Sequence, residues 1–275
     1  MNPVFINSVG LAAPGLMGWG EALPVLLSEQ GYRPAGMPKL VPAMLPSNER
    51  RRATRTIRLA LQACQEAMEN SPYRAEKVSS VFASSEGDTE LLDSLCTALA
   101  KENPVLSPFE FHNSVHNAPA GYWAIATGSH RASTSLCGFD GSFSCGLIDA
   151  VAQVAVESTP VMMVAYDQPL PPPLDAKRPL VAPFAAAFLI GPQPGEGDLA
   201  QARLRISTAP EEEDVLHDPE LERLRLGNPA ARGLPLLMAL ARKTQGGNSQ
   251  DGNSQERVTL PYQNGSRLIV ELAPC

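Results

Sequence analysis

The turn at residues 138–141, Gly-Phe-Asp-Gly, joins a short strand rich in serine and threonine to a helix of small residues. Its carboxylate, Asp140, has two interpretations. Asp is common at a helix start, where its side chain accepts N–H bonds from the first turn, here from Ser142 or Phe143. The alternative gives this carboxylate a further chemical role. The residue types leave both interpretations open.

Two cysteines flank this turn. Cys137 lies three residues before Asp140 on the strand, so its thiol should point away from the helix tip. Cys145 lies one turn into the helix, where it should face the core. Buried thiols of this kind are usually inert. We therefore expect neither cysteine to act as a nucleophile.

The histidines offer no better site. His112 and His116 are four residues apart, a spacing at which metal ligands share a helix face. No third ligand is evident nearby, and Pro108 and Pro119 argue against a regular helix there. The serines around residues 133–142 do not form a G-x-S-x-G elbow, which excludes an α/β-hydrolase site. We predict neither a metal site nor a cofactor.

Periodicity predicts the elements that position this turn. Alternating strands and helices imply a parallel-rich sheet covered by helices, with a long Pro- and Gly-rich loop at 31–46. The predicted strands are 4–6, 78–83, 132–136, 161–165, 184–190, 202–207 and 267–272. The predicted helices are 21–27, 47–70, 88–100, 118–127, 141–156 and 235–243. A polar Gly-Asn-Ser-Gln repeat at about 245–255 predicts a flexible loop.

Composition narrows the class of protein. The 275-residue chain carries a formal charge of −7, which argues against a nucleic-acid partner. Its one basic run, Arg50 to Arg52 with Arg55 and Arg58, indicates either a solvated helix face or a docking patch for an acidic carrier protein or partner subunit. Five cysteines without C-x-x-C spacing, and no secretory segment, predict a reduced cytoplasmic protein. No run is long enough for a membrane span.

The order of motifs from 107 to 149 resembles the β-ketoacyl-acyl-carrier-protein synthases. An S-P-F turn begins at Ser107, and an N-x-x-x-G-x-x-x-I-x-x-G helix follows from Asn117. Counted without a gap, the family's reactive cysteine falls on Asp140, which cannot carry an acyl thioester. The family's two catalytic histidines come from the second half of its longer chain, and no matching histidine loop is present here. The resemblance therefore implies a catalytically inactive member.

The resemblance also implies a fold and a role. The fold is thiolase-like, a layered α/β fold with a central mixed sheet covered by helices and a truncated second half. Residues 1–275 would form one such domain, of which 1–190 resemble the ketosynthase N-terminal half and 191–275 are a divergent remnant. The segments FHNSVHNAPAGYW, STSL and PVMMVAYDQPLPPPL resemble short ketosynthase-like subunits of bacterial aryl polyene clusters. Members without the nucleophile are chain-length factors.

Such a factor pairs with an active full-length β-ketoacyl-ACP synthase, as a heterodimer or higher heteromer, and shapes its acyl tunnel in polyene, polyketide or fatty-acid-like elongation. The acyl carrier protein is an indirect partner. The segment after S-P-F would cross to the partner subunit. The residues that the resemblance assigns to the tunnel or interface are Glu110, Phe111, His112, Asn113, Asn117, Leu91, Leu92, Ser133 and Ser135.

Two other functions remain open at this stage. One is a structural homodimer that scaffolds acyl carrier proteins without contacting the acyl chain. The other is a freestanding acyltransferase or thioesterase that uses Asp140 as a base with a histidine, although no histidine lies at a suitable spacing. The three functions differ in the partner they require and in the activity of the isolated chain.

Overall fold

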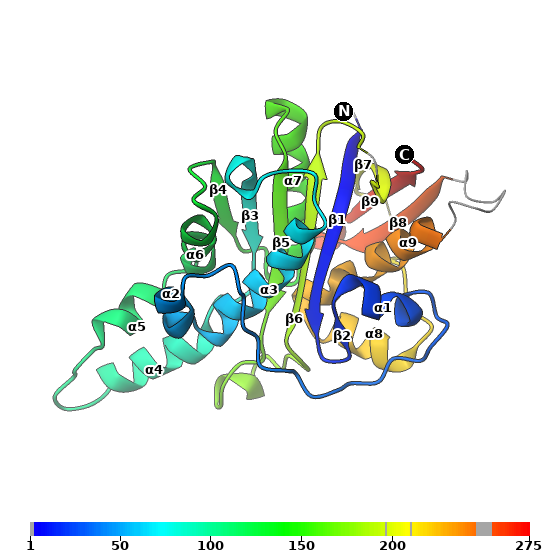
Figure 1. Ribbon diagram of the computed structural model, residues 1–275. Helices are drawn as coiled ribbons and strands as arrows, with labels where there is room; N and C mark the ends of the chain where they lie inside the picture. The colour runs from blue at the N-terminus through cyan, green and yellow to red at the C-terminus, as the bar shows by residue number, and fades with distance from the viewer. Residues whose placement is uncertain (1–2, 196, 210, 246–254) are drawn as a thin grey trace.

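The computed structural model describes residues 3–195, 197–209, 211–245 and 255–275. Within these residues nine strands form one sheet in the order β4-β3-β5-β6-β1-β7-β9-β8, with β2 paired to β1 (Figure 1). β3 pairs in parallel with both β4 and β5, and the other pairs are antiparallel. The sheet is therefore mixed, as the family resemblance implied, but most of its pairs are antiparallel, so the parallel-rich sheet expected from the alternation of strands and helices is wrong.

Five of the predicted strands are longer than the sequence patterns indicated, because pairing extends their apolar runs, whereas β3 and β4 each begin one residue later than predicted. Their bounds are β1 Val4–Ala13, β2 Leu16–Met17, β3 Ser79–Ala83, β4 Ser133–Leu136, β5 Val161–Asp167, β6 Phe184–Gly191, β7 Ala200–Ser207, β8 Glu256–Pro261 and β9 Arg267–Ala273. The last three strands continue the sheet beyond β1. Residues from the final quarter of the chain thus build on the same sheet as the first strand.

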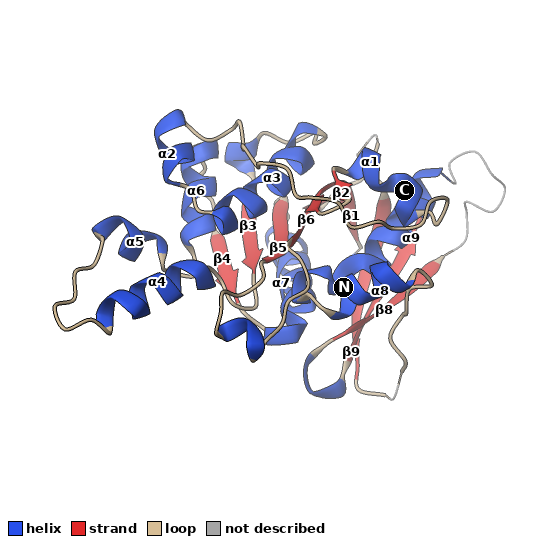
Figure 2. Cartoon of the chain, turned by 90° about the horizontal axis from the view of Figure 1, so that it is seen from below, coloured by secondary structure: helices blue, strands red, loops and turns tan. Residues whose placement is uncertain are grey.

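Helices cover both faces of the sheet (Figure 2). Their bounds are α1 Trp19–Leu26, α2 Ser47–Arg52, α3 Arg55–Glu69, α4 Thr89–Leu99, α5 Pro108–Asn113, α6 Ala118–Thr127, α7 Ser142–Glu157, α8 Pro219–Leu226 and α9 Leu234–Gln245. α3 and α6 pack on one face, and α1, α7, α8 and α9 contribute to the core on the other. Within the described residues, every helix is too short or too polar to cross a membrane.

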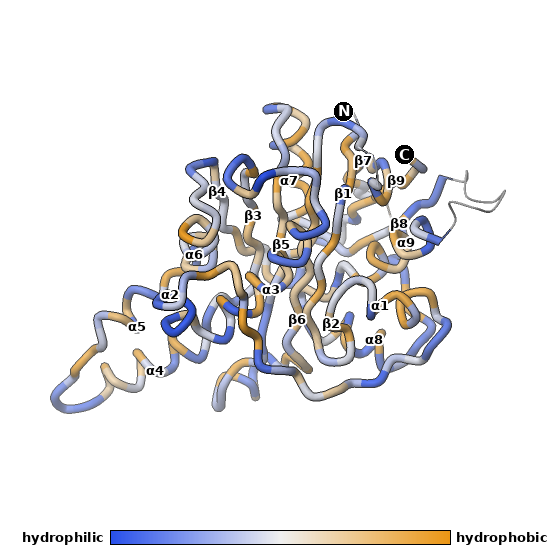
Figure 3. Tube along the Cα trace, viewed as in Figure 1, coloured by the Kyte–Doolittle hydropathy of each residue, from blue (hydrophilic) through white to orange (hydrophobic). Residues whose placement is uncertain are grey.

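The central strand β5 explains the two cores. All seven of its residues are buried, and successive side chains of a strand point to opposite faces. Met163 and Ala165 join the core under α7, whereas Met162, Val164 and Tyr166 join the core under α3. Figure 3 shows the apolar character of these central strands. The continuous apolar run is typical of a strand covered on both faces.

A glycine sets how closely α3 approaches β1. An ideal Cβ on Gly10 would lie 2.0 Å from the carbonyl oxygen of Ala63, so only glycine fits this position. One turn later on the same helix, the carboxylate of Glu66 accepts N–H bonds from Leu11 at 2.8 Å and Trp19 at 2.5 Å. Burial nevertheless raises the pKa of Glu66 above its usual value. α3 is thereby fixed to the first strand and the first helix.

The structure corrects three details of the predicted elements. The single helix predicted over 47–70 is two helices, because Ala53 is extended and Thr54 caps α3 by accepting an N–H bond from Ile57. A short helix, α5, begins at Pro108, since proline is tolerated in a first helical turn. α8 and β8 were not predicted. The Gly-Asn-Ser-Gln repeat lies outside the described residues, apart from its first and last positions.

The two ends of the sheet differ. At one end, the backbone of β8 is covered by Asp214, whose N–H donates to the Thr259 carbonyl and whose carboxylate accepts from the Thr259 N–H, both at 3.0 Å. At the other end, β4 pairs only with β3 among the described strands. The β8 edge is therefore blocked at Thr259 by the chain itself, whereas no described strand covers β4.

Candidate functional site

The turn that was expected to hold the site is an elbow between β4 and α7. Phe139 has φ of 53°, in the left-handed region, and a 3₁₀ turn spans Phe139–Gly141 before α7 begins at Ser142. The Ser142 hydroxyl accepts from the Gly138 N–H at 3.0 Å and donates to the Phe139 carbonyl at 2.7 Å. This serine closes the turn in place of a helix cap.

Asp140 is not the cap of α7. The N-cap is Gly141, and no side chain caps the helix there. Instead Asp140 Oδ1 accepts a hydrogen bond from Arg178 Nη2 at 2.9 Å. The predicted bonds from Ser142 or Phe143 are absent among the described contacts because the 3₁₀ turn delays the helix start. The carboxylate is turned outward into an ion pair.

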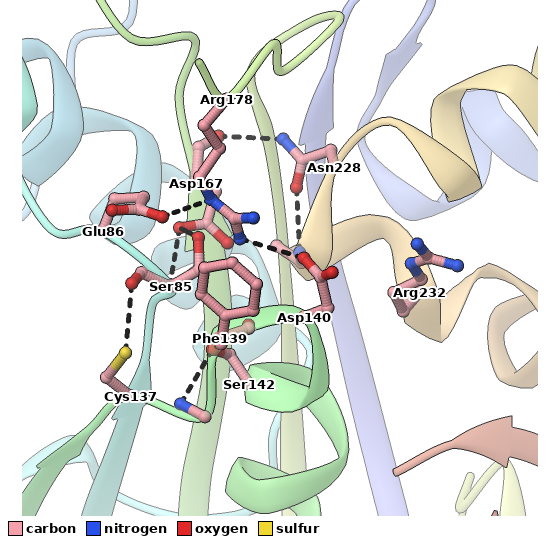
Figure 4. Close-up of polar contacts among 12 residues, drawn as sticks. Ser85, Glu86, Cys137, Phe139, Asp140, Ser142, Asp167, Arg178, Asn228 and Arg232 are labelled. Atoms are coloured by element: carbon pink, nitrogen blue, oxygen red, sulfur yellow. Dashed lines mark hydrogen bonds and ion pairs between the residues drawn. The ribbon is translucent and has the colours of Figure 1, made fainter. Parts of the chain in front are cut away.

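Arg178 organises three residues at this elbow (Figure 4). It pairs with Glu86 through Nε, pairs with Asp140 through Nη2, and places its Cζ atom 3.7 Å from the centre of the Phe139 ring. Its side chain is only 19% exposed. Charge-assisted bonds of a guanidinium on a partly buried surface are among the stronger side-chain contacts. They close the elbow from the side of the Pro-rich loop that follows β5.

A buried carboxylate lies behind this cluster. Asp167, at the end of β5, is 1% exposed, and its Oδ1 accepts from the Ser84 hydroxyl, the Ser85 N–H and the Ser85 hydroxyl at 2.8 to 3.0 Å. Burial outweighs these bonds and raises the pKa of Asp167 to about 6. Its Oδ2 has no partner among the described residues. The group fixes the segment after β3, from which Glu86 reaches Arg178.

Asn228 connects the same region to the following helices. Its side-chain amide donates to the Asp167 carbonyl at 3.2 Å and to the Ala182 carbonyl at 2.8 Å. Its Oδ1 accepts from the N–H groups of Ala230 and Ala231. The residue is fully buried. The side chain of Asn228 thus links the end of β5, the segment just before β6 and the turn before α9.

The two cysteines near the elbow have different surroundings, since Cys137 is exposed and Cys145 is half-buried. Cys137 donates its thiol hydrogen to the Ser85 carbonyl at 3.0 Å, toward the loop after β3. Cys145 is half-buried on α7, and burial raises the pKa of its thiol. Its sulfur lies against Gly138, where an added Cβ would approach it to 2.5 Å. The Cys137 thiol is directed away from the helix tip, as expected, but the expectation that Cys145 faces the core is wrong, because its sulfur lies beside Gly138 and accepts from Gln263 Nε2 at 3.4 Å.

Two parts of this site were not predicted from the sequence: the segment just after β8, and Arg178. Tyr262, Gln263 and Asn264, just after β8, line an open depression of about 540 Å³ together with residues 137–141. The Ser144 hydroxyl donates to the Pro261 carbonyl at 2.6 Å, which joins that segment to α7. Arg178 is the other missed element. Neither carries a local sequence signal, because each reaches the elbow only through the folded sheet.

Five predicted interface residues lie on one projecting arm, formed by α4, α5 and the loop between them (Figure 1). α4 carries Leu91 and Leu92, and α5 carries Glu110, Phe111 and His112. Leu92 and Phe111 are exposed, the latter by 64%. Glu110 Oε1 accepts from the Ser94 hydroxyl at 3.4 Å, which ties the two helices together.

Asn113 does not belong with these exposed residues. Its side chain is 1% exposed, donates to the Arg52 carbonyl at 3.3 Å and accepts from the Tyr122 hydroxyl at 3.3 Å. These bonds fix the base of the arm to α2 and α6. The interface assignment of Asn113 stays a prediction, and its side chain is occupied by bonds within the chain.

The remaining predicted residues lie beside the open edge. Asn117 is exposed at the start of α6, where it makes no capping side-chain bond. Ser133 is exposed on β4 and accepts from the Ser80 hydroxyl at 2.9 Å, whereas Ser135 is half-buried. The structure brings these three residues to the β4 end of the molecule. It does not bring them to the elbow cluster around Arg178.

The histidines lie apart from Asp140. His112 is exposed on α5, and His116 Nε2 lies 3.2 Å from the Ser84 carbonyl oxygen. Among the described residues, no histidine bonds to Asp140, and no cluster of three or more His, Cys, Asp or Glu side chains could hold a metal ion. An acid–base pair of Asp140 and a histidine is therefore not formed in the described part of the chain.

Comparisons with known proteins place this elbow in a family context. The model of the β-ketoacyl synthase N-terminal domain matches residues 27–250. No match is found among curated proteins.

Solved structures share the fold over the whole chain. The ketosynthase ApeO in complex with its chain length factor ApeC from Xenorhabdus doucetiae matches with a TM-score of 0.69, 20% identity, and coverage of 98% of this chain and 99% of that chain. The ishigamide ketosynthase/chain length factor matches with a TM-score of 0.74, 13% identity and 99% coverage of both chains. AntDE:AntF, a type II PKS acyl-carrier protein in complex with its ketosynthase bound to the hexaketide, matches with a TM-score of 0.78, 12% identity and full coverage of both chains.

The TM-scores show a shared fold, and the match of the family model over most of the chain shows the family. The mixed sheet, the covering helices and the elbow after β4 are the parts that the shared fold accounts for. The chain belongs to the β-ketoacyl synthase family, through its N-terminal domain.

Proposed function

We propose that this chain is a non-catalytic chain-length factor, which pairs with an active β-ketoacyl-ACP synthase and shapes the acyl tunnel of that partner. The observation that carries the proposal is the combination of an elbow whose Asp140 is held in an ion pair with Arg178 and a projecting arm that exposes apolar side chains. The similar structures that contain a ketosynthase with its chain length factor support the same assignment.

The elbow supports the non-catalytic part of the proposal. Asp140 stands where the family resemblance puts the reactive cysteine, and a carboxylate cannot form the acyl thioester. Arg178 neutralises that carboxylate and covers the Phe139 ring. A base that is held in an ion pair with a guanidinium is poorly suited to proton abstraction. The elbow thus functions as a structural element in this proposal.

The arm supports the tunnel-shaping part. It exposes Leu92, Leu99, Val105, Phe109 and Phe111. Soluble monomers rarely expose so many large apolar side chains on one segment, and such groups usually mark an interaction surface. Phe111 has the largest exposed ring on the arm. We propose that this ring closes the far end of the partner's acyl tunnel, with Leu91 and Leu92 beside it.

The open edge of the sheet supports the pairing geometry. β4 presents unpaired backbone groups, and its neighbour α6 exposes Ile125. An edge strand of this kind is a template for pairing with another chain. The proposed interface combines β4, α6 and the arm, with Asn117, Ser133 and Ser135 at its centre. Obligate interfaces of this type bury roughly 2,000 Å² or more.

The pairing is tested by native mass spectrometry of this chain co-expressed with the full-length ketosynthase encoded nearest to it. A complex with equal numbers of both chains is the expected result. If this chain instead forms only a homodimer that ignores the ketosynthase, the scaffold for acyl carrier proteins becomes the better assignment. Acyl transfer or hydrolysis by the isolated chain would favour a freestanding enzyme.

The tunnel role is tested with Phe111→Ala in the purified complex. Removing the ring should deepen the tunnel, so the product distribution should shift to longer chains, because tunnel depth is set by packed volume. Val156→Ala is the matched control, since Val156 is also exposed but lies at the end of α7, outside the arm. An unchanged product distribution in an intact Phe111→Ala complex would remove the gating role from this residue.

The product class is a finer part of the proposal. The segments shared with aryl polyene subunits, and the similarity to the ApeO–ApeC complex, favour a polyene product over a saturated fatty acid. Ultraviolet–visible spectroscopy of the reconstituted product distinguishes them, because a conjugated polyene absorbs in the visible range. A saturated product would contradict this part while leaving the pairing intact.

A further inference from the structure

A groove beside α2 and the first half of α3 combines positive charge with apolar surface. Its charged part, a depression of about 590 Å³, is lined by Lys39, Leu40, Val41, Ser47, Arg50, Arg51 and Arg58. The adjoining part, of about 310 Å³, shares Lys39 and Leu40 and is otherwise lined by Met37, Pro38, Arg55, Leu59, Gln168 and Pro183. We call the two parts together the α2–α3 groove. Volumes in this range suit small molecules.

The positive charge of this groove is not balanced by the chain. The protein has a net charge of −7, yet residues 39–58 hold six cationic side chains and only Glu49 as an acid. Glu49 pairs with Arg52, and Arg55 pairs with Glu90. Within the described residues, no carboxylate pairs with the four cations that line the charged part. These four positive charges are therefore available to an anionic ligand.

Two of these arginines hold buried nitrogen atoms without a partner. Nε of Arg50 and Nε of Arg58 are shielded from solvent and make no hydrogen bond among the described residues. Arg58 is oriented by its Nη2, which donates to the Arg50 carbonyl at 2.9 Å. A buried unsatisfied donor on a charged group is costly, so such groups usually meet an acceptor. An anion in the groove would provide one.

We propose that the α2–α3 groove binds a small phosphomonoester that carries an apolar chain. The phosphate lies among Arg50, Arg51 and Arg58, and the chain lies along Met37, Leu40 and Leu59. Guanidinium forks match the oxygen geometry of phosphate, and a phosphomonoester carries a charge of about −1.5 to −2 near neutral pH. The proposal is independent of the function proposed for the elbow and the arm.

Isothermal titration calorimetry of the full chain with n-octyl phosphate, below its micelle concentration, tests the proposal. We expect one site per chain, an affinity that falls as salt is added, and competition by inorganic phosphate, which should bind at least tenfold more weakly because it lacks the chain. Octyl glucoside, which has the same chain without charge, should not bind. Equal binding of both octyl compounds would overturn the proposal.

Substitutions of the groove arginines test where octyl phosphate binds. Arg58→Gln and Arg51→Gln should each weaken octyl phosphate binding about tenfold or more, since each removes charged donors. Arg51 is exposed, so its substitution should leave the fold intact even if Arg58→Gln does not. Arg223→Gln is the control, because Arg223 is exposed on α8 and pairs with Glu220. Wild-type affinity in folded Arg51→Gln and Arg58→Gln would overturn the proposal.

A separate variant tests the apolar part of the α2–α3 groove. Leu40→Ser should weaken octyl phosphate several-fold and leave inorganic phosphate unchanged. An acidic acyl carrier protein is the alternative occupant of this basic surface. If such a protein binds through Arg51 and Arg58 while octyl phosphate does not bind to the wild-type chain, the groove is a protein-docking surface and the small-molecule proposal is wrong.

Discussion

Arg178 and Phe139 form a cation–π pair, with the guanidinium carbon 3.7 Å from the centre of the ring. The two residues are 39 positions apart in the sequence, and Phe139 holds a left-handed backbone conformation that non-glycine residues rarely adopt. The arginine therefore packs against a ring that the elbow presents at a conformational cost. The pair joins the loop after β5 to the loop after β4.

We expect Arg178→Met to lower the free energy of unfolding by on the order of 1–3 kcal/mol, because it removes two ion pairs and the contact with the ring while keeping the aliphatic stem. Urea denaturation measures this change. Arg52→Met is the control, since Arg52 is largely exposed and pairs only with Glu49 three residues away; its effect should stay within about 1 kcal/mol. Equal effects of the two substitutions would show that the elbow cluster adds nothing beyond a surface ion pair.

The buried Asp167 predicts a pH dependence. Its pKa in the folded chain is about 6, above the ordinary value of 3.8, so the folded state favours the protonated form. The stability from this group is fully present below about pH 4 and is lost as pH rises through about 6. Relative to Asp167→Asn, the wild type should therefore lose roughly 2–3 kcal/mol between pH 4 and 7.

Urea denaturation of both proteins across this range measures the difference. The titration of all other groups is the same in the two proteins and cancels in the comparison. Any pH-independent cost of the asparagine shifts the free energy of unfolding by a constant and does not change its dependence on pH. Parallel stability curves for Asp167→Asn and the wild type would contradict the raised pKa of this carboxyl group.

Gly10 should not tolerate alanine. The added methyl group would lie 2.0 Å from the Ala63 carbonyl oxygen, which is backbone and cannot rotate away. We expect Gly10→Ala to cost about 3 kcal/mol or more, since α3 must move from β1. Gly121→Ala on α6 is the matched control, because an added Cβ there meets nothing within 4 Å and alanine favours a helix by about 0.5–1 kcal/mol. Thermal unfolding should move in opposite directions for the two variants, and a mild Gly10→Ala would mean that the approach of α3 is looser than described.

A buried arginine makes Glu222 indispensable to the packing of α8. Arg225 is 1% exposed, and its Nε and Nη2 each donate to Glu222 at 2.7 Å. Removing the charge with Glu222→Gln leaves only Glu213 to compensate a buried cation, which should cost about 3 kcal/mol. Glu220→Gln, which affects an exposed pair on the same helix, should cost less than about 1 kcal/mol. Chemical denaturation of both variants measures these costs, and coincident midpoints would refute the expectation.

The fold was largely predictable because its strands and helices carry strong local patterns. The apolar run at 161–165 and the small-residue helix after Gly141 are examples, and both lie where the periodicity put them. The break in the helix predicted over 47–70 was missed because alanine, here Ala53, is a good helix former. Its extended conformation reflects the cap that Thr54 provides to α3.

The site was less predictable because its contacts come from distant segments. Asp140 was expected to cap α7, and that expectation is typical for an aspartate at a helix start. The left-handed Phe139 and the arginine from the Pro-rich loop override it. Neither can be read from the residues next to Asp140. Phe111 was placed on an exposed segment by the resemblance alone, whereas the burial of Asn113 depends on Arg52 and Tyr122.

The unequal ends of the sheet limit how copies of this chain can join. Because Asp214 occupies the outward N–H and carbonyl groups of Thr259 in the middle of β8, a strand of another molecule meets more free backbone groups at β4 than at β8 among the described residues. Joining through β4 alone would close after two subunits, since each molecule then uses the same edge. Unbounded growth into fibres needs two open ends. The acidic segment beside Thr259 therefore works against pairing of a second chain at the middle of β8, whereas β4 stays available for such pairing.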